Sequence, residues 1–323
     1  MRNLALHLGV LLALAAWCGG QTRTPEIWRQ PTTAIANENM LAGAGGPDGG
    51  PHGDYTFVKE DMNGSNPKIV VRDGDHIKWT VKMGAEAQPE TVASRFVWAV
   101  GYFTRENYWL PRIEVKHLPA HLKRGSNLVR GGVIENVRLE RMPEGEKKIG
   151  EWKWDANPFS GTRELHGLAV VMALINNWDL KEVNNAVYKD REGNAEYVVS
   201  DLGASFGGNR EGLSAGRSKG NLKAYETSGF ITKATPEYVD FATPALPDPL
   251  DDIRFPLETR ERISMRSVTR HIPRPDAKWV GDLLSQLTPA QIRDAFLSAG
   301  YTQSEADAYA AIVEERIRHL SEL

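Results

Sequence analysis

The chain has 323 residues, a formal net charge of −3 and a single cysteine, Cys18. A chain of this length can bury a core of its own, and its mildly acidic charge argues against nucleic acid as a partner. If Cys18 is removed with an N-terminal signal, disulfides and thiolate metal sites are excluded as well.

The first 20 residues have the pattern of a secretory signal peptide. A short positive start precedes the apolar run LALHLGVLLALAAW, and small residues follow it. The run is too short to predict a membrane anchor, so no transmembrane span is expected after cleavage. Candidate cleavage sites follow Ala15, Ala16 and Gly20. Trp17 just before Cys18 fits a lipoprotein signal poorly. An exported chain that has no cysteine after cleavage is expected to be a bacterial protein of the periplasm or the cell surface.

Residues 21–53 are expected to form a flexible leader. The stretch 41–53 is rich in glycine, but its spacing does not match GxGxxG and Pro47 interrupts it. A strand-like YTFV follows where a dinucleotide-binding motif would begin a helix. These departures exclude a dinucleotide site in this stretch.

Three strands are predicted after the leader. Strand-like runs at 55–59 and 68–72 flank the turn-like segment NGSNPK at 63–68, and Asp73-Gly74 marks the turn before a third run. The alternating apolar residues of that third run are Ile77, Trp79 and Val81. Alternation with polar neighbours indicates a strand with one buried face.

Further strands and four helices complete an α+β pattern. Strand-like runs are found at 137–141, 185–188 and 196–200. The first helix has Pro89 in its first turn and Val92, Phe96, Val97 and Val100 as its stripe. The second has the stripe Leu165, Leu168, Met172 and Ile175, with Ser160 or Thr162 as its cap. Thr288 and Thr302 begin capping boxes of two C-terminal helices, the first of which closes at Gly300.

The most informative motif is NNWDLKEVNN at 176–185, followed by YVVSDLGASFG. Lys181 and Asn184 stand two and five residues after Asp179, and a strand–turn–strand pattern then leads to Asp201-Leu-Gly. This arrangement resembles the catalytic loop and metal-binding turn of the protein-kinase-like superfamily. The segment WTVK, which ends at Lys82, resembles the kinase strand whose lysine pairs with the α- and β-phosphates of ATP. Without that resemblance, the motif is a surface hairpin with incidental charges.

The resemblance implies a role for each polar residue of the loop and turn. Asp179 would accept the proton of an attacking hydroxyl, and Lys181 would lie near the transferred phosphoryl group. Asn184 and Asp201 would hold Mg²⁺, a hard cation that prefers oxygen ligands.

The resemblance also implies a nucleotide site on the first strands. Lys82 would bind phosphates, and Thr80, on the same face of the strand, would lie over the adenine. The carboxylate that pairs with Lys82 is expected to be Glu90, with Glu86 as second candidate. Gly64 and Ser65, in the turn at 63–68, would provide backbone amides for the phosphates. Without the resemblance, Lys82 is a solvated strand lysine, Glu90 a helix-start carboxylate and the turn a plain hairpin.

Three departures from typical protein kinases limit which branch of the superfamily the chain resembles. Trp178 precedes Asp179 where kinases that are switched by phosphorylation of the activation loop have an arginine, so that switch is not expected here. Leu202 replaces the usual phenylalanine. The short interval from Lys82 to Glu90 fits compact atypical branches, such as the spore-coat and secretory-pathway kinases. The stretch 207–223 is expected to be a mobile loop whose basic residues could hold an acidic substrate.

The sequence therefore predicts a two-lobed protein-kinase-like fold. Residues 54–145 would form a small antiparallel-sheet lobe, and residues 146–323 a mainly helical lobe with a C-terminal helical pair. Mg-ATP would bind between them, and the expected activity is phosphoryl transfer to a hydroxyl of a protein, sugar or small molecule. Two alternatives remain open: a catalytically silent binding module of the cell envelope, and a nucleotidyl transferase that uses the same residues.

Overall fold

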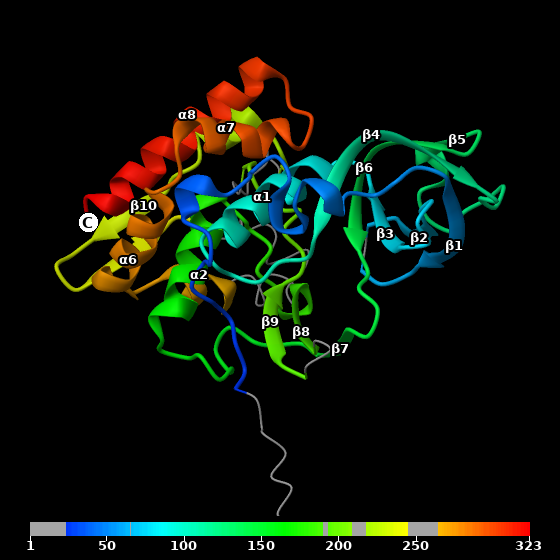
Figure 1. The fold of residues 1–323 in the computed structure, drawn as a ribbon. Coiled ribbons are helices and arrows are strands. Elements are labelled where there is room, and N and C mark those ends of the chain that lie inside the picture. The colour runs from blue at the N-terminus through cyan, green and yellow to red at the C-terminus, as the bar shows by residue number, and fades with distance from the viewer. Residues whose placement is uncertain (1–23, 65, 190–192, 209–217, 245–263) are drawn as a thin grey trace, which may run out of the picture.

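The computed structural model describes residues 24–64, 66–189, 193–208, 218–244 and 264–323. The expected signal peptide therefore lies outside the described residues. None of the helices within these ranges combines the length and the apolar character that a membrane span requires. The described chain contains a strand-rich part and a helix-rich part, which lie on the right and left of Figure 1.

The strand-rich part is a closed ring of five strands with a short sixth. Its strands are β1 (Tyr55–Asp61), β2 (Lys68–Arg72), β3 (Lys78–Met83), β4 (Asn107–Lys116), β5 (Val129–Arg130) and β6 (Val133–Arg141). The order is β3-β2-β1-β4-β6-β5, and an additional pairing of β3 with β6 closes the ring. Only β1 and β4 pair in parallel.

The ring encloses its own hydrophobic core. Trp79 and Val81 are fully buried in it, together with Ile69, Ile134 and Leu139 from neighbouring strands. The alternation that predicted a strand over the WTVK segment is thus present, and it directs Lys78, Thr80 and Lys82 to the outer surface of the ring. Asp73 fixes the turn before β3, because its carboxylate accepts hydrogen bonds from the Ile77 amide (2.9 Å) and the Trp79 indole (2.7 Å).

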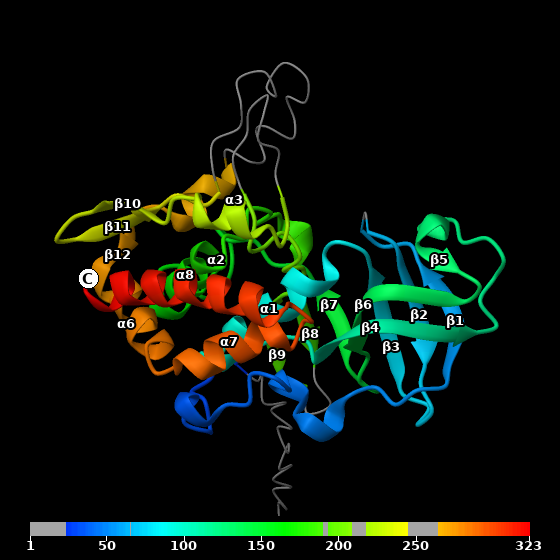
Figure 2. The same cartoon turned by 90° about the horizontal axis from the view of Figure 1, so that it is seen from above.

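The helix-rich part is built around a second core. Its helices are α1 (Ala87–Ala99), α2 (Arg163–Leu174), α3 (Leu222–Glu226), α6 (Arg274–Leu284), α7 (Pro289–Leu297) and α8 (Gln303–Ser321). Phe206 lies at the centre and meets Phe96 of α1, Phe296 of α7 and Tyr309 of α8 through ring contacts of 5.1 to 6.2 Å. Figure 2 shows α1 between the ring and the other helices. It thereby joins the two parts of the molecule.

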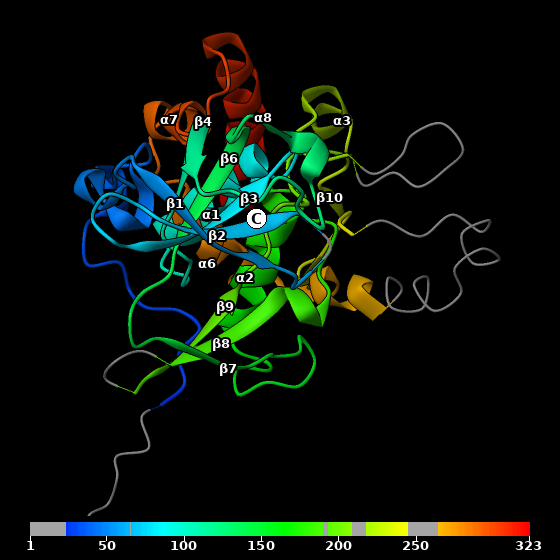
Figure 3. The same ribbon diagram turned by 90° about the vertical axis from the view of Figure 1, so that its right-hand side faces the viewer.

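Two small sheets and several 3-10 turns complete the helix-rich part. One sheet comprises β7 (Lys147–Gly150), β8 (Asn185–Lys189) and β9 (Ala195–Val199), and the other β10 (Ile231–Ala234), β11 (Tyr238–Phe241) and β12 (Ile272–Pro273). Figure 3 shows the β7–β8–β9 sheet at the opposite end of the molecule from α7 and α8. The predicted strand–turn–strand between the catalytic-loop motif and Asp-Leu-Gly corresponds to β8 and β9.

The expectation of a flexible leader is wrong for residues 24–53. Ile27, Ile35 and Met40 are buried in the larger core, and the Gln291 amide of α7 donates to the carbonyls of Ile35 and Glu38, both at 2.8 Å. Figure 2 shows this segment, in blue, running along α7 before it reaches β1. Its few apolar residues follow no regular period, which is why the sequence pattern did not identify a packed segment.

Candidate functional site

The site begins with the pairing of β3 and β6. Their register places Lys82 opposite Arg138 and Thr80 opposite Glu140 on the outer surface of the ring. Lys82 and Arg138 are only 3% and 4% exposed. Two buried cations side by side repel each other, so this arrangement requires carboxylates between them.

Glu90, in the first turn of α1, supplies one such carboxylate. Its Oε2 lies 2.6 Å from the Lys82 Nζ, and its Oε1 lies 3.0 Å from the Arg138 guanidinium. Arg138 also donates to Glu140 through both terminal nitrogens at 2.9 Å. Glu90 therefore links α1 to two adjacent strands at once.

Lys82 has two further acidic partners. Its Nζ lies 3.1 Å from Glu86 Oε2, just before α1, and 3.1 Å from Asp201 Oδ1, which belongs to the distant Asp-Leu-Gly turn. Both expected partners from the α1 region, Glu90 and Glu86, thus contact this lysine. Burial favours the neutral amine, but the charges of Glu90, Asp201 and Glu86 outweigh it and raise the pKa of Lys82. It is a buried ammonium, not a solvated strand lysine.

The Asp-Leu-Gly turn is fixed against the start of α1. Asp201 accepts a hydrogen bond from the Gly203 amide at 3.1 Å, and Leu202 is buried in the larger core. A Cβ on Gly203 would come within 2.9 Å of three Glu86 atoms, including its Cβ, so the approach requires glycine. Burial raises the pKa of Asp201, but Lys82 and the Gly203 amide outweigh this effect and lower it. Asp201 is therefore held as a carboxylate.

The catalytic-loop motif lies next to this turn. The Asn184 side chain donates to the Asp179 carbonyl at 2.8 Å, and the Asn184 carbonyl accepts from the Asp201 amide at 3.3 Å. Lys181 Nζ is 3.7 Å from the Asp179 carboxylate. The motif residues Asp179, Lys181, Asn184 and Asp201 thus lie together, and Asp201 contacts Lys82.

Asparagine amides hold the loop in this conformation. Asn177 accepts from the Asp179 amide at 3.0 Å, and Asn176 donates to the Gly207 carbonyl at 2.5 Å. Asn176 and Asn177 are fully buried. Burial raises the pKa of the Asp179 carboxyl, although the Lys181 charge opposes the shift. A carboxylate with a raised pKa is a better proton acceptor than an exposed aspartate.

The oxygens that could hold a cation gather around Asp201. Carboxylate oxygens of Glu86, Glu90 and Asp201 lie within 4.8 Å of one another. The side-chain nitrogen of Asn184 donates to the loop, so its side-chain oxygen, Oδ1, is the atom that could bind a metal. Hard oxygen donors of this kind suit Mg²⁺. The sequence indicated Asn184 and Asp201 as ligands, and the structure adds Glu86 to the neighbourhood.

The expected phosphate loop is less complete. Ser65 lies outside the described residues. Gly64, with φ +65°, lies between β1 and β2, and its carbonyl accepts from Arg124. Asn66 is the described residue of this loop that reaches the site, because its side chain donates to Glu86. Thr80 is half-buried beside Glu140 on the ring surface.

Three residues of the site were not identified from the sequence. Arg138 and Glu140 alternate with buried Val137 and Leu139, so the period-two pattern of VRLER contained a signal for a charged outer face. Lys219, from the stretch expected to be mobile, contacts Glu86. No local sequence pattern predicts the contact between Lys219 and Glu86.

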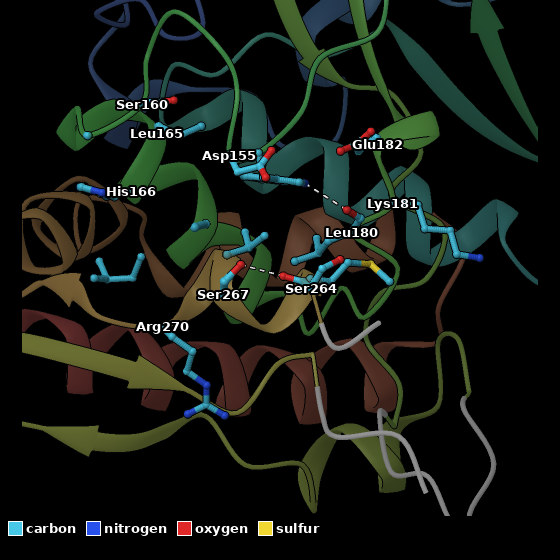
Figure 4. Close-up of a pocket in the computed structure, with 16 residues that line it drawn as sticks. Asp155, Ser160, Leu165, His166, Leu180, Lys181, Glu182, Ser264, Ser267 and Arg270 are labelled. Atoms are coloured by element: carbon cyan, nitrogen blue, oxygen red, sulfur yellow. Dashed lines mark hydrogen bonds between the residues drawn. The ribbon is translucent and has the colours of Figure 1, made fainter. Parts of the chain in front are cut away.

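A separate pocket has Leu180, Lys181 and Glu182 of the catalytic-loop motif in its lining. Its volume is about 550 Å³, and Leu165, His166, Leu180, Lys181, Met265 and Arg270 are among the residues that line it. Figure 4 shows Lys181 at the edge of this pocket. Two of its polar lining residues are paired with residues outside the lining: His166 with Asp276 at 2.6 Å and Arg270 with Thr232 at 2.9 Å.

Comparisons with known proteins give a similarity of structure but none of sequence. No protein-family model and no curated protein sequence matches the chain. Among solved structures, the fold is similar to the Helicobacter pylori proinflammatory kinase CtkA, with a TM-score of 0.48, 12% identity and coverage of 84% of this chain and 98% of that chain. It is also similar to the Golgi casein kinase, with a TM-score of 0.35, 11% identity and coverage of 84% and 73%. At this level of similarity, the activity has to be inferred from the site itself.

Proposed function

We propose that this chain transfers the terminal phosphoryl group of Mg-ATP to a hydroxyl acceptor. The ring and α1 would be the small lobe of a protein-kinase-like fold, and the remaining helices its large lobe. One observation supports the proposal most strongly: Lys82, Glu90 and Asp201 come from three separate elements and form one buried ionic cluster next to Asp179 and Asn184. Burying ionised side chains is costly, and such clusters are found preferentially at functional sites.

Each residue has a role that follows from its position. Lys82 would exchange part of its carboxylate contact for nucleotide phosphates, while Glu90 keeps it in place. Asp201 and Asn184 would hold Mg²⁺, which neutralises charge on the transferred group and on the leaving phosphate. Asp179 would orient the acceptor hydroxyl and take its proton as the new O–P bond forms and the bond to the departing ADP oxygen breaks. Lys181 lies beside Asp179 and would stabilise charge on the transferred phosphoryl group.

The test is a single-site variant of the proton acceptor. Asp179→Asn keeps the size of the side chain but removes the base, so turnover should fall by roughly 10² to 10⁴, the usual value of general-base assistance. Affinity for Mg-ATP should stay nearly unchanged. Asp48→Asn, an exposed position, is the matched control. An Asp179→Asn enzyme with full activity would contradict the assignment.

Analysis of the reaction product distinguishes the proposed kinase from a nucleotidyl transferase and from a silent binding module. A nucleotidyl transferase would leave an AMP adduct on its acceptor, whereas a kinase leaves a phosphate, and intact mass distinguishes them. A silent module would form no product with wild-type protein. The complete set of Lys82, Asp179, Asn184 and Asp201 favours the enzyme over the silent module, because a binding module has no need to retain all four.

Export to the periplasm or cell surface is part of the proposal. It rests on the signal-like residues 1–20, and the acceptor is a hydroxyl-bearing molecule of unspecified class. Mass spectrometry of the protein from a periplasmic fraction tests export, because it shows whether the N-terminal signal has been cleaved.

A further inference from the structure

The chain returns to the site after the Asp-Leu-Gly turn. Amides of Gly220 and Asn221 donate to the carbonyls of Ser205 and Phe206 at 2.9 and 2.8 Å. Ser218 exchanges two hydrogen bonds with Gly208, at 2.8 and 3.1 Å. Residues 218–221 are therefore fastened alongside 205–208, and the expectation of a mobile loop over 207–223 is wrong for its described residues.

This close approach depends on a glycine and a tryptophan. A Cβ on Gly207 would lie 2.0 Å from the Ser218 carbonyl oxygen, so only glycine fits there. The same carbonyl accepts a hydrogen bond from the Trp178 indole at 3.2 Å. Trp178 immediately precedes Asp179, so residues 218–221 are fixed directly to the catalytic loop.

Lys219 extends from this fastened segment into the site. Its Nζ pairs with Glu86 Oε1, while the other oxygen of the same carboxylate lies 3.1 Å from Lys82 Nζ. The ammonium also lies 5.8 Å from the centre of the Trp178 ring. Trp178 is the residue immediately before Asp179 in the chain. Lys219 thus shares a carboxylate with Lys82 and lies near the tryptophan that precedes Asp179.

We propose that Lys219 binds the terminal phosphoryl group of the nucleotide, an inference that rests on the proposed function. The two lysines share the single carboxylate of Glu86. In the proposed function, the terminal phosphate would lie farther from Lys82 and close to Asp179, and Lys219 is fixed next to the residue that precedes Asp179. Lys219 would exchange Glu86 for phosphate oxygens, and it would do so for a triphosphate but not for a diphosphate.

The test compares ATP with ADP. Lys219→Gln should weaken Mg-ATP binding by about 10- to 100-fold, the effect of losing one charge-assisted hydrogen bond, and leave Mg-ADP binding nearly unchanged. Lys219→Arg should recover most of the ATP affinity. Lys223→Gln, at an exposed position four residues on, is the matched control and should change neither affinity.

The other outcomes overturn the proposal in distinguishable ways. Equal loss for ATP and ADP would show that Lys219 only supports the fold, and a gain for both would show that its pair with Glu86 blocks the site. Either result leaves nucleotide binding, and with it the proposed function, standing. A wild-type protein that binds neither nucleotide would refute both. The melting temperature of Lys219→Gln should stay close to wild type, because Glu86 keeps its contact with Lys82.

Discussion

Lys82 and Asp201 are 119 residues apart in the chain, and the Lys82 Nζ donates to Asp201 Oδ1 at 3.1 Å. This contact joins the strand ring to the Asp-Leu-Gly turn of the helix-rich part. It also means that the lysine expected to bind phosphates is already neutralised by carboxylates. In the proposed function, nucleotide binding would therefore be an exchange of anions around a fixed cation.

Replacing Lys82 should destabilise the protein as well as abolish nucleotide binding. Lys82→Met leaves Glu86, Glu90 and Asp201 without their shared cation, and breaking a buried ion pair of this kind costs about 3–5 kcal/mol. Denaturant unfolding should show the loss. Lys78→Met, exposed on the same strand, should leave stability within about 0.5 kcal/mol of wild type. Equal stability of the two variants would contradict the charge cluster.

Replacing Glu90 should lower the stability of the fold, because its carboxylate pairs with two buried cations at once. Glu90→Gln keeps the shape but leaves Lys82 and Arg138 facing each other with one anion fewer. We expect a loss of about 3 kcal/mol or more in the free energy of unfolding. Glu114→Gln, exposed on β4, is the control. If both variants unfold at the same denaturant concentration, Glu90 does not hold the two cations together.

Gly203→Ala tests the approach of the Asp-Leu-Gly turn to α1. The added methyl group would overlap Glu86 at 2.8 to 2.9 Å, and overpacking of this kind typically costs about 1–3 kcal/mol. The shift of Glu86 should also weaken Mg-ATP binding. Gly150→Ala has no atom within 4 Å of the added methyl and is the comparison. Retention of wild-type stability and affinity in Gly203→Ala would place the turn elsewhere.

The pH dependence of turnover should report Asp179. Because burial raises its pKa, the carboxyl becomes protonated at a higher pH than an exposed aspartate, whose ordinary value is about 3.9. A protonated carboxyl cannot accept a proton, so the rate should fall as the pH drops through this raised pKa. The acid limb should be absent from the residual activity of Asp179→Asn. An unchanged limb in that variant would assign it to another group.

Local sequence patterns predicted the strands and helices better than they predicted the long-range contacts of the side chains. The alternation of Trp79 and Val81 and the capping boxes at Thr288 and Thr302 correspond to β3, α7 and α8, because period and cap chemistry are properties of short segments. The same reasoning placed Lys82 on one face of a strand. What that face meets depends on the β3–β6 register and on α1, which no short window contains.

The rest of the site was missed for a related reason. Lys219 follows a glycine- and arginine-rich stretch that has no periodicity, yet Gly207 and Trp178 fasten it to the catalytic loop. Arg138 was inside a predicted strand, but its pairing with Glu90 is recognisable only once the helix and strand are packed. Residues 24–53 were similarly misjudged, because their contacts with α7 are long-range.

The most direct test of the account is calorimetric titration of the chain with ATP in the presence of Mg²⁺. Wild-type protein should bind saturably, and Asp201→Asn should bind about tenfold more weakly or worse, a difference of about 1.4 kcal/mol. Asp48→Asn should match wild type. In EDTA, wild type and Asp201→Asn should bind ATP with similar affinity, because the Asp201 carboxylate is expected to act on the nucleotide through the metal ion. A wild-type protein that shows no binding of Mg-ATP would contradict the proposed function.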